Sequence, residues 1–261
     1  TIDITKGIPT DIPVFAFSKS NYDLLLDEVA LNENIVVTLS GYSKLKENTT
    51  SDFIIGEIEG TKKNEYIYVT ANRDSFLESF FGSKVPVGEL ICLAKTLVNE
   101  NYKPKYTIRF MITTGQEWGS INRYEYNVGI DNYLKTIDAD KVKYCLVLDG
   151  SKPFENSVLT EYQVSSSNKK LKGQLTDLNE KIKEEDIGFM TLINDISDSY
   201  KTEGLVWDKY GVNTIIQAEP MSSSYYLIEN TNADSTVLLL NKDMCKYLMY
   251  YNYTILKQLN K

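Results

Sequence analysis

Residues 102–120 read YKPKYTIRFMITTGQEWGS, and this stretch decides the fold. Its centre, Tyr106–Thr113, is rich in β-branched and aromatic residues in an alternating pattern, which predicts a strand. Gly115, Gln116 and Glu117 follow that strand directly. Ligands of open α/β sheets bind beyond the carboxyl ends of the strands, so the end of this strand is a candidate site.

Two more predicted strands run into polar residues of the same kind. Glu65–Thr70 leads into Asn72 and Asp74, and Lys143–Leu148 ends at Asp149. Asp74, Asp149 and Glu117 thus make three carboxylates at strand ends, and such ends can converge on one spot. Aspartate and glutamate also cap helices and begin turns, so the residues alone leave a purely structural interpretation open.

Short β-rich runs alternate with helical patterns along the chain, which is typical of a mainly parallel sheet covered by helices. The strands Asp52–Glu59 and Glu65–Thr70 read as a hairpin with residues 60–63 as its turn. The apolar stripe of the last helix, which includes Tyr251, predicts packing against the sheet. We expect an α/β fold with a mixed, mainly parallel central sheet and helices on both faces. Further helices are expected at Val87–Asn99, Glu125–Lys135, Lys169–Glu185 and Lys242–Leu259, and further strands at Leu159–Val164 and Val212–Ile216.

The N-terminal part reads strand, helix, strand and linker, over Ile12–Phe17, Ser18–Val29, Asn34–Leu39 and Ser43–Ser51. This part is too short to bury a complete core of its own. We therefore expect a partial segment over residues 1–50 and one larger domain over residues 51–261.

Composition excludes several kinds of chemistry. The chain has 261 residues, a formal net charge of −8 and no histidine, so a serine nucleophile would lack its usual base. Neither a phosphate-binding glycine loop nor a G-x-S-x-G elbow occurs. The negative charge disfavours nucleic acid as a partner, because nucleic acids bind to basic surfaces. No apolar run is long enough to predict a membrane-spanning segment.

Three stretches carry a recognisable pattern: FIIGEIEGTKKNEYIYVTANRDSF at 53–76, LAKTLVNENYKPKYTIRFMITTGQEWGS at 93–120 and YCLVLDG at 144–150. Together they resemble the M28 family of zinc-dependent aminopeptidases. The segment DKYGVNTIIQ at 208–217 is similar to the family's closing strand. IPVFAFSKSNYDLLL at 12–26 resembles the end of the protease-associated domain that many members carry. The resemblance implies a phosphorylase/hydrolase-like fold of the zinc-aminopeptidase type.

The resemblance also implies which residues would form the family's centre of two zinc ions, and several positions depart from it. Asn72 stands at the position of the first histidine, and Gln116 at that of the general-base glutamate. The bridging aspartate falls near Phe81 and Gly82, where there is no acid, and Leu227 stands at the position of the final histidine. A glutamine cannot carry a proton from water to a leaving amine, and leucine offers nothing to a metal. We expect neither catalysis nor a zinc ion.

Other positions of the centre keep their acids. Glu117 and Asp149 stand at ligand positions, and Asp74 is the residue that supports the first histidine in the family. Sites made of oxygen ligands suit calcium or magnesium, which leaves room for a single ion of that kind. The competing interpretation is that these acids bind backbone donors and basic side chains, with Arg73 and Arg123 as candidates.

The sequence therefore predicts a catalytically inactive M28 peptidase-like domain that serves as a protein-binding or structural module. Its partner would be a protein or peptide that the sequence does not identify. Relatives with a protease-associated domain are mostly secreted or tethered to membranes, which favours an extracellular or cell-surface location. The alternative is a metal-dependent aminopeptidase or related hydrolase with a divergent metal site.

Overall fold

The fold is known from a computed structural model. It describes residues 15, 17–31, 34–42, 50–75, 79–117, 126–149, 153–154, 156–165, 168–183, 188–196, 202–218, 232–235 and 239–261.

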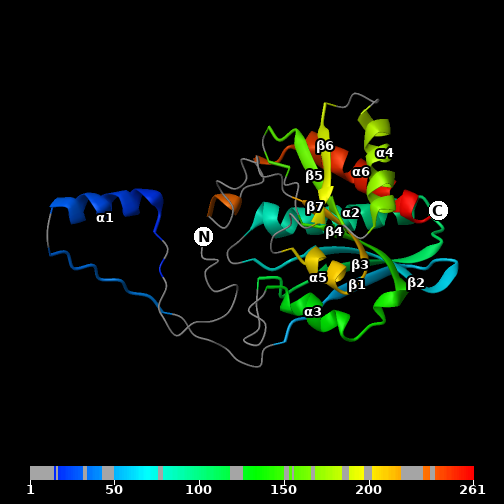
Figure 1. The fold of residues 1–261 in the computed structure, drawn as a ribbon, viewed down its shortest axis with the longest axis horizontal. Coiled ribbons are helices and arrows are strands. Elements are labelled where there is room, and N and C mark those ends of the chain that lie inside the picture. The colour runs from blue at the N-terminus through cyan, green and yellow to red at the C-terminus, as the bar shows by residue number, and fades with distance from the viewer. Residues whose placement is uncertain are drawn as a thin grey trace.

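Seven strands form one sheet in this described part of the chain (Figure 1). Across the sheet the order is β1-β3-β2-β4-β7-β5-β6. β2 runs parallel to β3 and β4, β4 to β7, and β5 to β6, whereas the β1–β3 and β5–β7 pairs are antiparallel. The sheet is thus mixed and mainly parallel, as predicted. The strands are β1 (Ile54–Ile58), β2 (Lys62–Asn72), β3 (Tyr106–Thr113), β4 (Val142–Leu148), β5 (Leu159–Val164), β6 (Met190–Asp195) and β7 (Asn213–Ala218).

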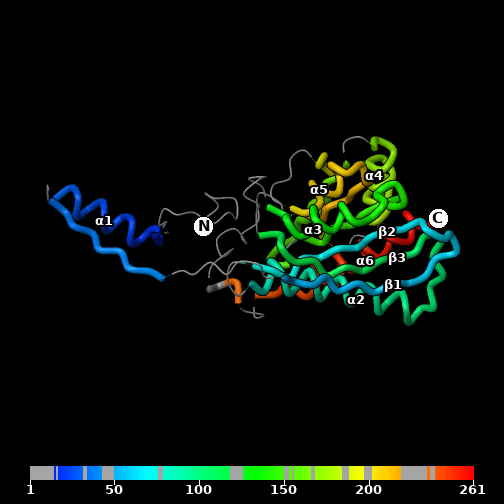
Figure 2. Tube along the Cα trace, turned by 90° about the horizontal axis from the view of Figure 1, so that it is seen from below, coloured from blue at the N-terminus to red at the C-terminus, as the bar shows by residue number. Residues whose placement is uncertain are grey.

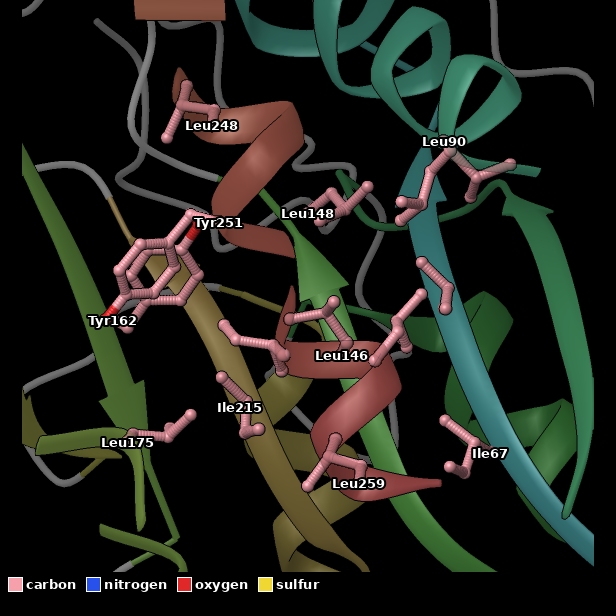
Figure 3. Packing of buried hydrophobic residues seen from close by; sticks show 14 of the residues in the cluster. Ile67, Leu90, Leu146, Leu148, Tyr162, Leu175, Ile215, Leu248, Tyr251 and Leu259 are labelled. Carbon is pink, nitrogen blue, oxygen red and sulfur yellow. The ribbon is translucent and has the colours of Figure 1, made fainter. Parts of the chain in front are cut away.

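Helices cover both faces of the sheet, which confirms the expected fold class (Figure 2). On one face, helices α2, α4 and α6 pack on strand residues such as Ile67, Leu146 and Ile215 (Figure 3). On the other face, α3 and α5 pack on residues such as Met111 and Cys145. The helices are α2 (Val85–Asn99), α3 (Val128–Leu134), α4 (Lys169–Lys183), α5 (Gly204–Lys209) and α6 (Lys242–Leu259).

The last helix behaves as its apolar stripe predicts. The stripe of α6 is buried, and its Tyr251 ring stacks on Tyr162 of β5 with 4.8 Å between ring centroids (Figure 3). Both rings belong to the larger core cluster, so α6 packs directly on β5.

The predicted hairpin is wrong. β1 and β2 are not neighbours, because β3 lies between them and pairs with both. The connection passes close to the approach to β3: a side chain at Gly60 would lie 2.4 Å from the backbone carbon of Tyr106, so only glycine fits there. Thr61 and Lys62 donate backbone hydrogen bonds to the carbonyls of Pro104 and Lys105. The Gly-Thr segment connects β1 to β2, but its hydrogen-bond partners are Pro104 and Lys105, which lie 43 residues after Thr61 and Lys62.

Other local predictions differ from the structure in specific places. The strand β6 and the helix α5 were not assigned from sequence, and a π-helical turn η1 (Phe80–Lys84) precedes α2 where a loop was expected. Two 3-10 turns, η2 (Ala139–Lys141) and η5 (Asn232–Ser235), complete the described elements.

The N-terminal helix α1 (Lys19–Leu31) forms where predicted, but the strand expected at Asn34–Leu39 does not. No described residue pairs with that stretch as a strand, and Val36 is 92% exposed. None of the residues of α1 is buried, and it lies outside the layered body in Figures 1 and 2. The expected strand at Ile12–Phe17 and linker at Ser43–Ser51 lie mostly outside the described residues, so the division at residue 50 stays a prediction.

Candidate functional site

The candidate site lies at the carboxyl ends of three neighbouring strands. Successive side chains of a strand point to opposite faces of the sheet. Tyr68 of β2, Met111 of β3 and Cys145 of β4 belong to the core under α3 and α5. Counting on in steps of two along β2 and β4 brings Asn72 and Asp149 to that same face. The predicted convergence of these strand ends follows from the register of the sheet.

Asp74 binds backbone donors. Its two carboxylate oxygens accept the backbone N–H groups of Gln116 and Glu117, at 3.3 and 3.1 Å. The chain can present both N–H groups because Gly115 has a positive φ of 81° and turns it sharply after β3. Arg73 points elsewhere, since its guanidinium donates to the Ser51 hydroxyl and the Asp52 carbonyl. Asp74 thus accepts backbone amides, which are one of the two kinds of partner that the structural interpretation of the sequence names.

Gln116 and Asp149 are brought together. The Gln116 side-chain nitrogen lies 3.4 and 3.3 Å from the two carboxylate oxygens of Asp149 and donates to them. Gln116 is only 8% exposed, and its carbonyl oxygen Oε1 has no hydrogen-bond partner among the described residues. Asn72, 5% exposed, likewise has an Oδ1 without a described partner. A layer of amide oxygens and carboxylates therefore lines the strand ends.

Glu203 is a site residue that the sequence analysis did not find. It comes just before α5, is 2% exposed and lies beside Thr70 and Thr113. The pKa of Glu203 is raised to about 8, mainly by burial; the hydroxyls of Thr70 and Thr113 lower it, and the charges of Asp149 and Asp74 raise it. The neutral form of the carboxyl is therefore favoured at pH 7. The sequence could have indicated it through the topology: α5 leads into β7, so the residue that precedes α5 lies over the carboxyl edge of the sheet. We define the strand-tip site as Asn72, Asp74, Gln116, Glu117, Asp149 and Glu203.

The position expected for a bridging aspartate is filled differently. Phe81 is fully buried, and its backbone N–H donates to Asp234 of η5 at 2.8 Å. The Ser79 hydroxyl donates to the other oxygen of Asp234 and accepts the Gly82 N–H. An acid from far along the chain thus ties η5 to the start of η1 through hydrogen bonds. Leu227 and Arg123 lie outside the described residues.

The residues of the strand-tip site do not fit zinc. Asn72 and Gln116 offer neutral amides, and the chain has no imidazole to recruit. Within the described stretches, no three His, Cys, Asp or Glu side chains come close enough together to hold a metal ion. The donor set is made of oxygen atoms, several of which are already engaged by N–H groups.

Among the helices that the structure describes, none combines the length and the apolar character needed to cross a bilayer.

The fold has well-defined structural neighbours, although no family model and no curated protein matches the sequence. A zinc aminopeptidase from Bacillus subtilis superposes with a TM-score of 0.66 at 15% identity, over 82% of this chain and 52% of that one. A peptidase M28 precursor from Shewanella amazonensis gives 0.61 at 19% identity, over 82% and 46% of the two chains. A glutaminyl cyclase from Porphyromonas gingivalis gives 0.61 at 11% identity, over 79% and 77%. The chain thus spans about half the length of the two peptidases.

Proposed function

Because the chain has the fold of zinc aminopeptidases and glutaminyl cyclases, we propose that it is a catalytically inactive member of this group that binds a protein or peptide. The observation that carries the proposal is the pair formed by Gln116 and Asp149. A carboxylate at position 116 would be able to take a proton from water, whereas an amide has no proton to exchange at neutral pH. The site binds polar groups but has lost the step that cleaves a bond.

The N-terminal part supports a binding role. Within residues 15–42 almost every large apolar side chain is exposed, for example Leu31 at 79% and Val36 at 92%. Apolar surface of this extent is typical of a segment whose partner surface is missing. We infer that residues 1–50 belong to a protease-associated-like unit and that residues 51–261 form the peptidase-like domain. The proposed partner is a protein and not a nucleic acid, because the whole chain carries a formal net charge of −8.

An extracellular or cell-surface location belongs to the same proposal. It rests on the resemblance of residues 12–26 to a protease-associated domain and on the precursor form of one structural neighbour. No metal cofactor is part of the proposed function.

The test is a combined measurement of metal content and turnover on the purified full-length chain. We expect substoichiometric zinc, and no release of nitroaniline from a panel of aminoacyl-nitroanilides, with or without added zinc, manganese or calcium. Binding is then measured with a fluorescent peptide library by anisotropy. Stoichiometric zinc with turnover would contradict the proposal, and so would the absence of any binding to peptides and to folded proteins.

A second candidate is a hydrolase with a divergent metal site. It is favoured by one observation: the charges of Asp74 and Asp149 act on Glu203, although these three carboxyl groups do not lie close enough together in the described residues to form a metal site. Oxygen ligands of this kind suit a calcium or magnesium ion. Turnover that depends on one of these ions, and that is lost in Asp149→Asn, would favour this candidate over the first.

A further inference from the structure

We infer that the side-chain amide of Gln116 holds the Asp149 carboxylate in place and thereby does the positioning that a cation would do at these strand ends. The inference deepens the proposed function, because it explains how the site stays ordered without a metal. It makes Gln116 a positioning residue and not merely the remnant of a lost base.

The geometry points to this role. The Gln116 nitrogen lies at nearly equal distances, 3.4 and 3.3 Å, from the two oxygens of Asp149, so it faces the whole carboxylate rather than one oxygen. The amide is 8% exposed, which shields the contact from competing water. Asp149 is half-buried at the edge of the sheet, and a carboxylate in such surroundings is stabilised by hydrogen-bond donors that favour its charged form.

The backbone of Gln116 is fixed independently of its side chain. Asp74 accepts the Gln116 N–H, and the Gln116 carbonyl accepts the Asn127 N–H at 2.8 Å. The side chain therefore starts from a rigid position and reaches across from the end of β3 to the end of β4. A substitution at 116 changes the contact to Asp149 without removing what anchors the loop.

The surroundings of the pair are rich in acceptors. Asp74 lies on one side, Glu203 is close enough for the Asp149 charge to act on it, and Asn72 Oδ1 has no described partner. With glutamine at 116 the layer gains two N–H donors and no charge. With glutamate at 116 two carboxylates would face each other at about 3.3 Å, an arrangement that requires either a shared proton or a cation.

The first experiment is a double-mutant cycle followed by thermal unfolding of the full chain. Gln116→Met keeps the length of the side chain and removes the donor, and Asp149→Asn removes the charge. We expect Gln116→Met to lower Tm by about 5 °C in the wild-type background and by less than about 1 °C in the Asp149→Asn background. An equal loss in both backgrounds would overturn the inference, because it would mean that Gln116 acts by packing alone.

The second experiment uses Gln116→Glu and reads out cation dependence, which a purely structural residue would not change. We expect the Tm of the wild type and of Gln116→Met to be the same in chelator and in millimolar calcium or zinc. The Tm of Gln116→Glu should fall by roughly 5 °C in chelator at pH 8 and recover with calcium. A cation-dependent Tm in the wild type would overturn the inference. So would a Gln116→Glu protein that is as stable as the wild type in chelator.

The two proposals fail in different ways. Peptide binding by a protein whose double-mutant cycle shows no coupling would leave the proposed function standing and remove only the role of Gln116. Coupling between Gln116 and Asp149 in a protein that hydrolyses peptides would leave the role of Gln116 standing and remove the proposed function.

Discussion

Two buried polar regions lie on opposite faces of the same sheet, and only one of them is fully hydrogen-bonded. On the α2–α6 face, Asn252 donates to Glu89 and to Gln217, the latter at 2.7 Å, and accepts the Tyr162 hydroxyl at 2.8 Å. Gln217 also donates to Glu89 at 3.2 Å. We call these four residues the core network. On the opposite face, the strand-tip site leaves oxygens of Asn72, Gln116 and Glu203 without described partners.

The difference indicates what shaped each region. A buried polar group without a partner costs free energy, so a network that serves only the fold tends to satisfy all its members. The core network does so with groups from α2, β5, β7 and α6, and it fixes how these elements pack. The strand-tip site keeps unmatched acceptors at the edge where ligands of α/β sheets bind. Under the proposed function, these unmatched acceptors serve binding and not the packing of the core.

We expect the largest loss of stability on substitution of Asn252, which is completely buried. Asn252→Ala would leave the Glu89 carboxylate and the Tyr162 hydroxyl short of partners and create a cavity between α6 and the sheet. We expect the free energy of unfolding to fall by about 3–5 kcal/mol, the range for breaking a buried charged network. Guanidinium denaturation measures it. A loss below about 1 kcal/mol would show that the core network does not hold α6 in place.

Glu203 should give a smaller effect that depends on pH. Its pKa is about 8 in the folded protein against an ordinary value of 4.5, so the folded state binds a proton that the unfolded state releases. The stabilisation is fully present below pH 4.5 and is lost as the pH rises to about 8.

The neutral variant Glu203→Gln removes this pH dependence. We expect it to match the wild type near pH 5 and to exceed it in free energy of unfolding by roughly 3–4 kcal/mol at pH 9, because each pH unit between 5 and the folded pKa costs the wild type about 1.4 kcal/mol. The two proteins are compared by urea denaturation across this range. If the wild type were equally stable at both pH values, Glu203 would be ionised in the fold, and the strand-tip site would be more solvated than the structure indicates.

The sequence predicted the regular part of the fold well, because regular elements follow from local patterns. The stripe of α6 and the alternating β3 segment 106–113 were found within a residue or two. The hairpin failed because strand pairing is not local: the Gly60 turn is compatible with either neighbour, and only the packing of Tyr106 against it decides. β6 was missed because its Met190 and Leu192 lie exposed at the edge of the sheet.

The site was predictable to the extent that it follows from register. Asp74, Glu117 and Asp149 were singled out because the strand ends of a parallel sheet meet at one edge, whereas Asn72 and Gln116 were singled out by the family resemblance. Two other residues could not be placed from the register of the strands. Glu203 enters from a short helix of six residues, and Asp234 reaches Phe81 from 153 residues away. No spacing rule connects such positions, so only the folded chain reveals them.

The smallest effect is expected at Asn72, which provides the matched counterpart to Asn252. Both are asparagines at most 5% exposed, and both become alanine, so the volume removed is the same. Asn72→Ala removes an acceptor that no described residue uses, and we expect a loss of less than about 1 kcal/mol in the same guanidinium experiment. The comparison tests the difference in hydrogen-bond partners between the end of β2 and the middle of α6. A loss at Asn72 as large as that at Asn252 would mean that the strand-tip layer is a second structural network. The distinction on which the binding role rests would then disappear.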